Sequence, residues 1–304
     1  MNTEMIIDVH HHVIGKNNPN YANFPKWDIQ IDAEENARLG IGGAMLSLPV
    51  SSTPEQTRAI NDFLTGFAAY DTRRYGVLAC LPSAHVDAAL KEIEYAYDTL
   101  HADGFCMPSN TGGMYIGDDR MDEILAELNR RSAVVLLHPV KPGGETPLLT
   151  VRDFSVYEFP FDTTRAIMDL IFSGKMKKYS NIKWIVSHAG GAIPYLVYRF
   201  STVAEESKAI NLSKEDVIDS FKNLYYDLAL STSDGVFQTL KAVVGTSQIV
   251  FGTDAPLRPQ IGTQDSVEIF NNTTVFTDEE KQNIARKTSA ELFSRFAHKS
   301  GIGL

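Results

Sequence analysis

The stretch IIDVHHHVIG, residues 6–15, sets three consecutive histidines at the end of a short apolar run. Runs of this length, rich in β-branched or aromatic residues, are typical of strands that are buried on both faces. Further runs of the same kind recur along the chain. The predicted strands span residues 5–11, 43–49, 75–81, 104–107, 133–138, 182–188, 223–230 and 247–254. The sequence therefore predicts eight buried strands.

Segments with helical spacing of apolar residues lie between these runs. The clearest predicted helices span residues 87–101, 121–131, 163–179 and 277–297. Thr277 and Glu280 have the spacing of a capping box at the start of the last of them. Strand alternating with helix indicates parallel strands joined by right-handed crossovers, and eight such units in 304 residues predict a closed (β/α)8 TIM barrel. An open, doubly wound sheet is the alternative.

The segments between these elements predict how the chain is organised. No Pro/Gly/Ser-rich linker or low-complexity tract interrupts the alternation, so we expect residues 1–304 to form a single domain. Segments 13–31, 139–160 and 255–274 are predicted to be long polar loops, which often carry functional residues.

Composition excludes several classes of partner and location. The formal net charge is −10 and the Lys and Arg residues are scattered, which argues against a nucleic acid partner or an anionic membrane surface. We find neither a secretory leader nor an apolar run long enough to cross a membrane. Cys80 and Cys106 cannot form a disulfide framework. We therefore expect a cytoplasmic protein.

Four histidines and one aspartate stand at the ends of predicted strands. His10 and His12 end the first run, His138 the fifth, His188 the sixth and Asp254 the eighth. Because the carboxyl ends of barrel strands meet at one mouth, these side chains are expected to converge. Side chains alternate along a strand, so His10 and His12 share one face whereas His11 points the other way.

Imidazole and carboxylate groups are the ligands that zinc and similar first-row divalent ions prefer. Three or four such ligands with an open position are typical of a catalytic metal site, and Asp8 is a candidate for orienting these histidines. The alternative is that these histidines are ordinary core or rim residues. Surface roles are expected for His85, His101 and His298. The sequence lacks the G-x-S-x-G, H-E-x-x-H and Walker A motifs.

Several motifs together resemble a known family. They are HHHV (10–13), LLHP (136–139), FDTTRAIMDLIFSG (161–174), VSHAGGAIPYLVYRF (186–200), YYDLALS (225–231) and FGTDAP (251–256). The chain resembles the amidohydrolase superfamily, in particular the branch of aminocarboxymuconate semialdehyde decarboxylase and 6-methylsalicylate decarboxylase. This resemblance implies a metal-dependent barrel with one divalent ion, commonly Zn²⁺, with Mn²⁺ as the alternative.

The resemblance also implies roles for individual residues. Its metal ligands are His10, His12, His138 and Asp254, and its catalytic histidine is His188. Arg199 matches an arginine that binds the substrate carboxylate across a dimer interface, which implies a homodimer. An ordinary surface arginine is the alternative.

The chain departs from the family pattern at two places. Asp32 stands where an arginine is often found, so a second clamp on the substrate carboxylate is expected to be missing. Met107 and Pro108 stand where binuclear members carry a carboxylated lysine, which implies a single metal.

Two reactions suit such a site. The first is non-oxidative decarboxylation of a small aromatic or unsaturated carboxylic acid, with His188 or Asp254 delivering the proton that replaces CO2. The alternative is hydrolysis of a lactone, ester or amide, in which Asp254 takes a proton from water and His188 stabilises the oxyanion. A barrel that only binds metal or senses a small molecule is a third hypothesis. Unused polar groups in the mouth would destabilise such a barrel, which argues against it.

Overall fold

The computed structural model describes residues 6–14, 27–50, 52–143, 154–257 and 260–299. Eight parallel strands form one sheet in the order β1-β2-β3-β4-β7-β8-β9-β10. They are β1 (Ile6–His12), β2 (Ile41–Ser47), β3 (Tyr75–Ala79), β4 (Gly104–Pro108), β7 (Val134–His138), β8 (Lys183–Val186), β9 (Tyr225–Asp227) and β10 (Ile249–Val250). Each predicted strand is present, although β9 and β10 are shorter than expected.

Hydrogen bonds between the first strand and the segment after β10 close the sheet into a barrel. The amide of Val9 donates to the carbonyl of Phe251 over 3.0 Å, and the amide of Asp254 donates to the carbonyl of His10 over 2.9 Å. A parallel bridge joins His11 to Ala255. The prediction of a (β/α)8 TIM barrel is therefore confirmed, and the doubly wound alternative is wrong.

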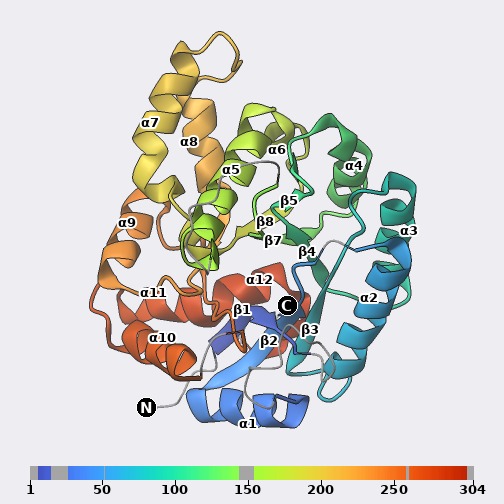
Figure 1. The fold of residues 1–304 in the computed structure, drawn as a ribbon. Coiled ribbons are helices and arrows are strands. Elements are labelled where there is room, and N and C mark those ends of the chain that lie inside the picture. The colour runs from blue at the N-terminus through green and yellow to red at the C-terminus, as the bar shows by residue number, and fades with distance from the viewer. Residues whose placement is uncertain (1–5, 15–26, 51, 144–153, 258–259, 300–304) are drawn as a thin grey trace.

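Helices surround the barrel, and a short hairpin extends its rim (Figure 1). The helices are α1 (Ile29–Leu39), α2 (Pro54–Ala68), α3 (Val86–Asp98), α4 (Asp122–Arg130), α5 (Glu158–Phe172), α6 (Lys175–Lys178), α7 (Ile193–Glu206), α8 (Lys214–Lys222), α9 (Asp234–Val244), α10 (Gln260–Asn272), α11 (Asp278–Gln282) and α12 (Thr288–Leu292). Short helical turns are η2 (Asp119–Met121), η3 (Phe154–Val156), η4 (His188–Gly190), η5 (Asn283–Lys287) and η6 (Ser294–Lys299), and the hairpin pairs β5 (Asn110–Thr111) with β6 (Met114–Tyr115). Together α7 and α8 form an arm that projects from the barrel (Figure 1).

The loop predicted over residues 255–274 is wrong in its larger part, because α10 occupies Gln260–Asn272. Its buried positions Thr263, Ser266, Val267 and Phe270 form one narrow stripe. Only Val267 and Phe270 in this stripe are apolar, so the hydrophobic pattern is too weak to predict a helix from the sequence. Parts of the other two predicted loops, residues 15–26 and 144–153, lie outside the described residues.

The predicted helix over 277–297 begins as expected but is not continuous. Thr277 and Glu280 form the predicted capping box. The π-helical turn η5 then interrupts the helix, and the backbone becomes extended at Phe293. This change of direction lets Phe293 and Phe296 join the apolar cluster inside the barrel. Gly43 makes room for Phe296, since a Cβ atom at position 43 would lie 2.7 Å from the ring of Phe296.

The inner cluster fills the amino-terminal half of the barrel. It combines Ile7 and Val9 of β1 with inward residues of the other strands and with the C-terminal segment. A second, larger cluster lies between the sheet and the helices. Apolar side chains fill the amino end, and the polar residues at the carboxyl ends of the strands lie at the opposite mouth of the barrel. In the described part of the chain, no helix is both long enough and apolar enough to cross a membrane.

Candidate metal centre

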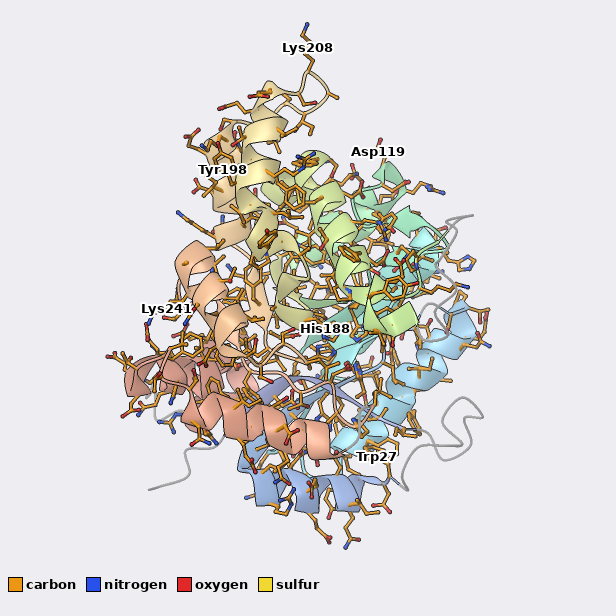
Figure 2. All side chains as sticks on the ribbon, turned by 60° about the vertical axis from the view of Figure 1, so that its left-hand side comes forward. Trp27, Asp119, His188, Tyr198, Lys208 and Lys241 are labelled. Atoms are coloured by element: carbon orange, nitrogen blue, oxygen red, sulfur yellow. The ribbon has the colours of Figure 1, made fainter. Side chains whose placement is uncertain are left out.

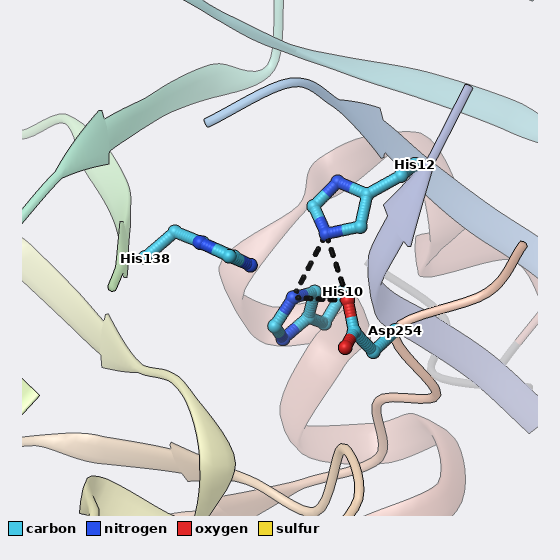
Figure 3. Close-up of side chains that lie close together, drawn as sticks. All are labelled: His10, His12, His138 and Asp254. Atoms are coloured by element: carbon cyan, nitrogen blue, oxygen red, sulfur yellow. Dashed lines mark hydrogen bonds and ion pairs between the residues drawn. The ribbon is translucent and has the colours of Figure 1, made fainter. Parts of the chain in front are cut away.

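The structure brings His10, His12, His138 and Asp254 together at the barrel mouth (Figure 3). One potential ligand atom from each residue lies within 4.8 Å of the others. The Nε2 atoms of His10 and His12 are 3.1 Å apart, and Oδ1 of Asp254 lies 3.1 Å from Nε2 of His12 and 3.5 Å from Nε2 of His10. All four residues are buried, as expected for strand ends that converge in a barrel.

The hydrogen bond that Nδ1 of each histidine makes fixes which nitrogen of the ring carries the proton. Nδ1 of His10 donates to the Asp227 carboxylate over 2.8 Å, Nδ1 of His12 to the carbonyl of Ser47 over 3.1 Å, and Nδ1 of His138 to the carbonyl of Pro139 over 2.7 Å. In the neutral form, each of these imidazoles therefore turns an Nε2 lone pair toward the centre.

The result is a set of converging acceptors. Nε2 of His138 is buried and has no hydrogen-bond partner among the described residues, and the carboxylate of Asp254 has no proton to offer the facing lone pairs. Acceptors that converge in this way repel one another unless a cation lies between them. These residues therefore fit a divalent ion, with three nitrogen ligands and one oxygen ligand.

Burial and neighbouring charges favour the protonation states that a metal requires at three of the four residues, with His10 as the exception. Burial lowers the pKa of His12 and holds that of His138 well below its usual range. Burial acts in the same direction on His10, but Asp227 and Asp254 outweigh it and raise its pKa. Burial raises the pKa of Asp254, yet His12 and His10 outweigh burial and lower it. Asp254 is therefore a carboxylate at neutral pH.

Asp227 at the end of β9 is a buried residue that sequence reasoning missed. Its Oδ2 accepts from Nδ1 of His10, and its Oδ1 accepts from the backbone amide of His188 over 2.9 Å. It thus orients one candidate ligand and anchors the segment that carries His188. The sequence feature that could have indicated Asp227 is its position in YYDLALS, where it is a carboxylate near the end of a predicted strand. The expectation for Asp8 is wrong, because Asp8 contacts the backbone amide of His10 and not its ring.

His188 lies beside the four converging groups. Its ring centroid is 5.1 Å from that of His10 and 5.8 Å from that of His138. Nδ1 donates to the carbonyl of Ala229 over 3.0 Å, which leaves Nε2 to exchange a proton. His188 and Ala189 both have a φ of 55°, a left-handed conformation that is uncommon outside glycine and is often found at functional sites.

His11 points away from the mouth, as strand alternation predicts, and its ring makes two hydrogen bonds to buried carboxylates. Its Nδ1 donates to Asp8 and its Nε2 to Asp32, each over 2.9 Å, and all three side chains are buried. Burial lowers the pKa of His11, but Asp32 and Asp8 outweigh burial and raise it to about 10. His11 is therefore an imidazolium held between two carboxylates.

Asp32 lies on α1, outside the barrel, and not at a substrate clamp. It accepts hydrogen bonds from His11, Trp27, Asn36 and Tyr75. Its position in the fold thus explains why an aspartate is suited there: it balances the charge of His11. A single substitution to arginine would place two cations side by side.

Replacing His11 with asparagine is expected to lower the free energy of unfolding by about 3 kcal/mol, because two buried carboxylates lose their cation. Metal content is expected to stay unchanged. Urea unfolding and elemental analysis measure the two effects. The exposed His85, which makes no capping hydrogen bond, provides the control His85→Asn. An equal loss of metal in His11→Asn and His10→Ala would contradict the assignment of His11 to the outer face.

The interaction of His11 with Asp8 and Asp32 also predicts how the stability of the protein depends on pH. Because the pKa of His11 is raised, its stabilising effect is complete below about pH 6.5, the pKa in the unfolded chain, and is lost as the pH rises through about 10. The difference in stability between wild type and His11→Asn is therefore expected to shrink over this range in urea unfolding series. A difference that grows with pH would show that His11 is neutral.

Arg199 lies on α7 and does not join the other predicted site residues. It is exposed, and within the described residues it has no ion-pair partner. Its neighbour Tyr198 lies on the projecting arm, away from His188 (Figure 2). His85 and His101 are exposed, as predicted, whereas the side chain of His298 lies outside the described residues.

Comparisons with known proteins identify the family of this chain. The Amidohydrolase family profile matches residues 7–295. A 6-methylsalicylic acid decarboxylase from Aspergillus aculeatus is 31% identical over 282 residues, 84% of this chain and 86% of the relative. One from Penicillium expansum is 30% identical over 315 residues, 95% and 96% of the two chains.

A solved structure adds evidence for the fold. The dihydroxybenzoic acid decarboxylase from Polaromonas sp., solved with bound manganese and the inhibitor 2-nitroresorcinol, superposes with a TM-score of 0.81 at 19% identity. The superposition covers 96% of this chain and 97% of that one. With the profile match over nearly the whole chain and the two relatives above, it follows that this chain belongs to the amidohydrolase family.

Proposed function

We propose that this protein is a metal-dependent carboxy-lyase that removes CO2, without oxidation, from a small aromatic or unsaturated carboxylic acid. The observation that carries the proposal is the convergence of three Nε2 lone pairs and one carboxylate beside His188. The relatives named as 6-methylsalicylic acid decarboxylases support this reaction over hydrolysis of a lactone, ester or amide, which the same residues could perform.

The reaction breaks the bond between the ring carbon and the carboxylate. The electron pair stays on that carbon, which takes a proton, and CO2 leaves. A bound divalent ion would hold a substrate oxygen and withdraw negative charge. His188 is fixed by Ala229 and turns Nε2 toward the mouth, so it is placed to deliver the proton. Asp254 is the second group able to carry a proton there.

We propose His10, His12, His138 and Asp254 as the ligands and Zn²⁺ as the ion, since three imidazoles and one carboxylate suit it. Mn²⁺ is the alternative, because the Polaromonas decarboxylase holds manganese. Elemental analysis of protein purified without chelators distinguishes them. We also propose that residues 1–304 act as one domain in the cytoplasm, where the free, buried Cys80 and Cys106 stay reduced.

A substrate screen tests the reaction. Purified protein is incubated with 6-methylsalicylate, 2,6-dihydroxybenzoate and a muconate-type acid, and CO2 release is measured. Lactones and amides serve as controls. Release of CO2 from one of the acids is expected, with the ring-protonated product in equal amount. Turnover of a lactone or amide without CO2 release from any acid would favour the hydrolase instead.

We further propose that the protein is a homodimer in which α7 forms the contact. Tyr195, Tyr198 and Val203 are 86, 75 and 49% exposed on this helix, a large apolar surface for a monomer. Tyr195 and His188 also line the same cavity of about 180 Å³, so part of this exposed surface adjoins the proposed catalytic histidine. Arg199, without an ion-pair partner in the described chain, then reaches the substrate carboxylate of the neighbouring subunit.

Arg199→Ala is expected to weaken substrate binding by about 2 to 5 kcal/mol, the usual loss for one partner of a buried charge pair. Lys208→Ala, on the same arm, is the control and should bind normally (Figure 2). Mixing Arg199→Ala with inactive His188→Asn should restore activity, because a mixed dimer holds one site with both residues. Failure to complement after confirmed subunit exchange, or a fully active monomer, would contradict the shared site.

A further inference from the structure

A buried cluster of polar side chains lies next to His138 and is not used by the proposed chemistry. Asp162 of α5 is completely buried. It accepts hydrogen bonds from the hydroxyl of Ser109, from Nδ2 of Asn110 over 3.0 Å and from the hydroxyl of Tyr115 over 2.6 Å. This buried side chain accepts from three donors, and these hydrogen bonds hold its partners in fixed positions.

Ser109 connects this cluster to the segment that carries His138. Its backbone amide donates to the carbonyl of His138 over 2.8 Å. Its hydroxyl donates to Asp162 and accepts from the backbone amide of Val140 over 3.0 Å. Asn110 adds a bond from Nδ2 to the carbonyl of Lys141 over 3.3 Å. Hydrogen bonds from the successive residues Ser109 and Asn110 therefore join the turn after β4 to the turn after β7.

One peptide group of this turn contacts both Ser109 and the candidate ligand. The peptide between Pro139 and Val140 gives its N–H to the hydroxyl of Ser109, and its carbonyl accepts from Nδ1 of His138 over 2.7 Å. Because a peptide group is planar, fixing its N–H end fixes the direction of its carbonyl. That carbonyl decides which nitrogen of His138 carries the proton and where the ring points.

From this geometry we infer that Ser109 and Asp162 are positioning residues for His138. They act through the Pro139–Val140 peptide, so that Nε2 of His138 is unprotonated and aimed at the metal. The inference rests on the proposed metal site. It deepens that proposal, because it assigns the preorganisation of one ligand to a residue in the turn after β4 and a residue on α5, neither of which is a proposed ligand.

Zn²⁺ binding to the metal-free protein tests this role separately from catalysis. The protein is stripped with a chelator and titrated with Zn²⁺ against a competing chelator, and its unfolding temperature is measured without metal. Ser109→Ala is expected to raise the dissociation constant for Zn²⁺ about 10- to 100-fold, the usual effect of losing an outer hydrogen-bond partner. Asp162→Asn, which leaves the Ser109 hydroxyl in place but weakens its acceptor, should act in the same direction.

Tyr115→Phe is the matched control. It removes a hydrogen bond from the same carboxylate but does not touch Ser109 or the Pro139–Val140 peptide. It should lower the unfolding temperature and leave Zn²⁺ affinity unchanged. Wild-type affinity in both Ser109→Ala and Asp162→Asn would overturn the inference, as would an equal loss of affinity in Tyr115→Phe. Absence of Zn²⁺ binding to the wild type would instead overturn the metal site itself.

Discussion

His188→Asn is expected to lower kcat by about 10²- to 10⁴-fold, the range typical of a lost general acid or base. Asparagine can still donate to the carbonyl of Ala229, as Nδ1 of His188 does, but it cannot exchange a proton at neutral pH. Metal content should remain that of the wild type, because His188 is outside the proposed ligand set. Steady-state kinetics and elemental analysis on the same preparation measure both.

The exposed His101 offers a control, and His101→Asn should have normal kcat. Two results would contradict the assignment. Loss of metal from His188→Asn would make His188 a ligand, and wild-type turnover would remove it from the reaction and leave Asp254 as the proton donor.

His12→Ala is expected to remove the ion and the activity together. His12 contributes the nitrogen closest to both His10 and Asp254, and its loss leaves a gap in the centre of the ligand set. The loss of metal affinity should exceed the roughly 10- to 100-fold cost of losing an outer partner. Calorimetric titration of the metal-free protein with Zn²⁺ or Mn²⁺ measures it.

Removal of metal from the wild type gives the complementary experiment. Chelation should abolish CO2 release, and adding back Zn²⁺ or Mn²⁺ should restore it, whereas the same addition to His12→Ala should not. A His12→Ala protein that keeps stoichiometric metal, or a chelated wild type that remains active, would show that the ligand assignment is wrong.

The sequence predicted the barrel and the members of the site because both follow from short-range patterns. Strand periodicity placed His10 and His12 on one face and His11 on the other, and barrel topology brought the distant strand ends together. The structure confirms the fold and this proximity, and the comparisons confirm the amidohydrolase resemblance. The catalytic and ligand roles stay predictions until the variants are measured.

The partners that orient the site could not be predicted in the same way. Asp227 pairs with His10 across 217 positions, and Asp162 pairs with Ser109 across 53. No local pattern encodes such pairs, because they depend on the stagger between strands and on how α5 packs. Asp8 illustrates the problem. Its spacing from His10 suggested a contact with the ring of His10, but the carboxylate of Asp8 accepts from the ring of His11 and from the backbone amide of His10.

Barrel closure by the segment after β10 also has a consequence for protein synthesis. The ribosome produces the chain from its amino end, so His10 and His12 emerge first, whereas Asp254 and the hydrogen bonds from Phe251–Ala255 to β1 become available only after β10 has been made. A nascent chain therefore lacks Asp254, the fourth proposed ligand, until the segment after β10 has left the exit tunnel. Polypeptides truncated before β10 lack both barrel closure and the fourth proposed ligand, so we expect them to bind metal more weakly than the full chain.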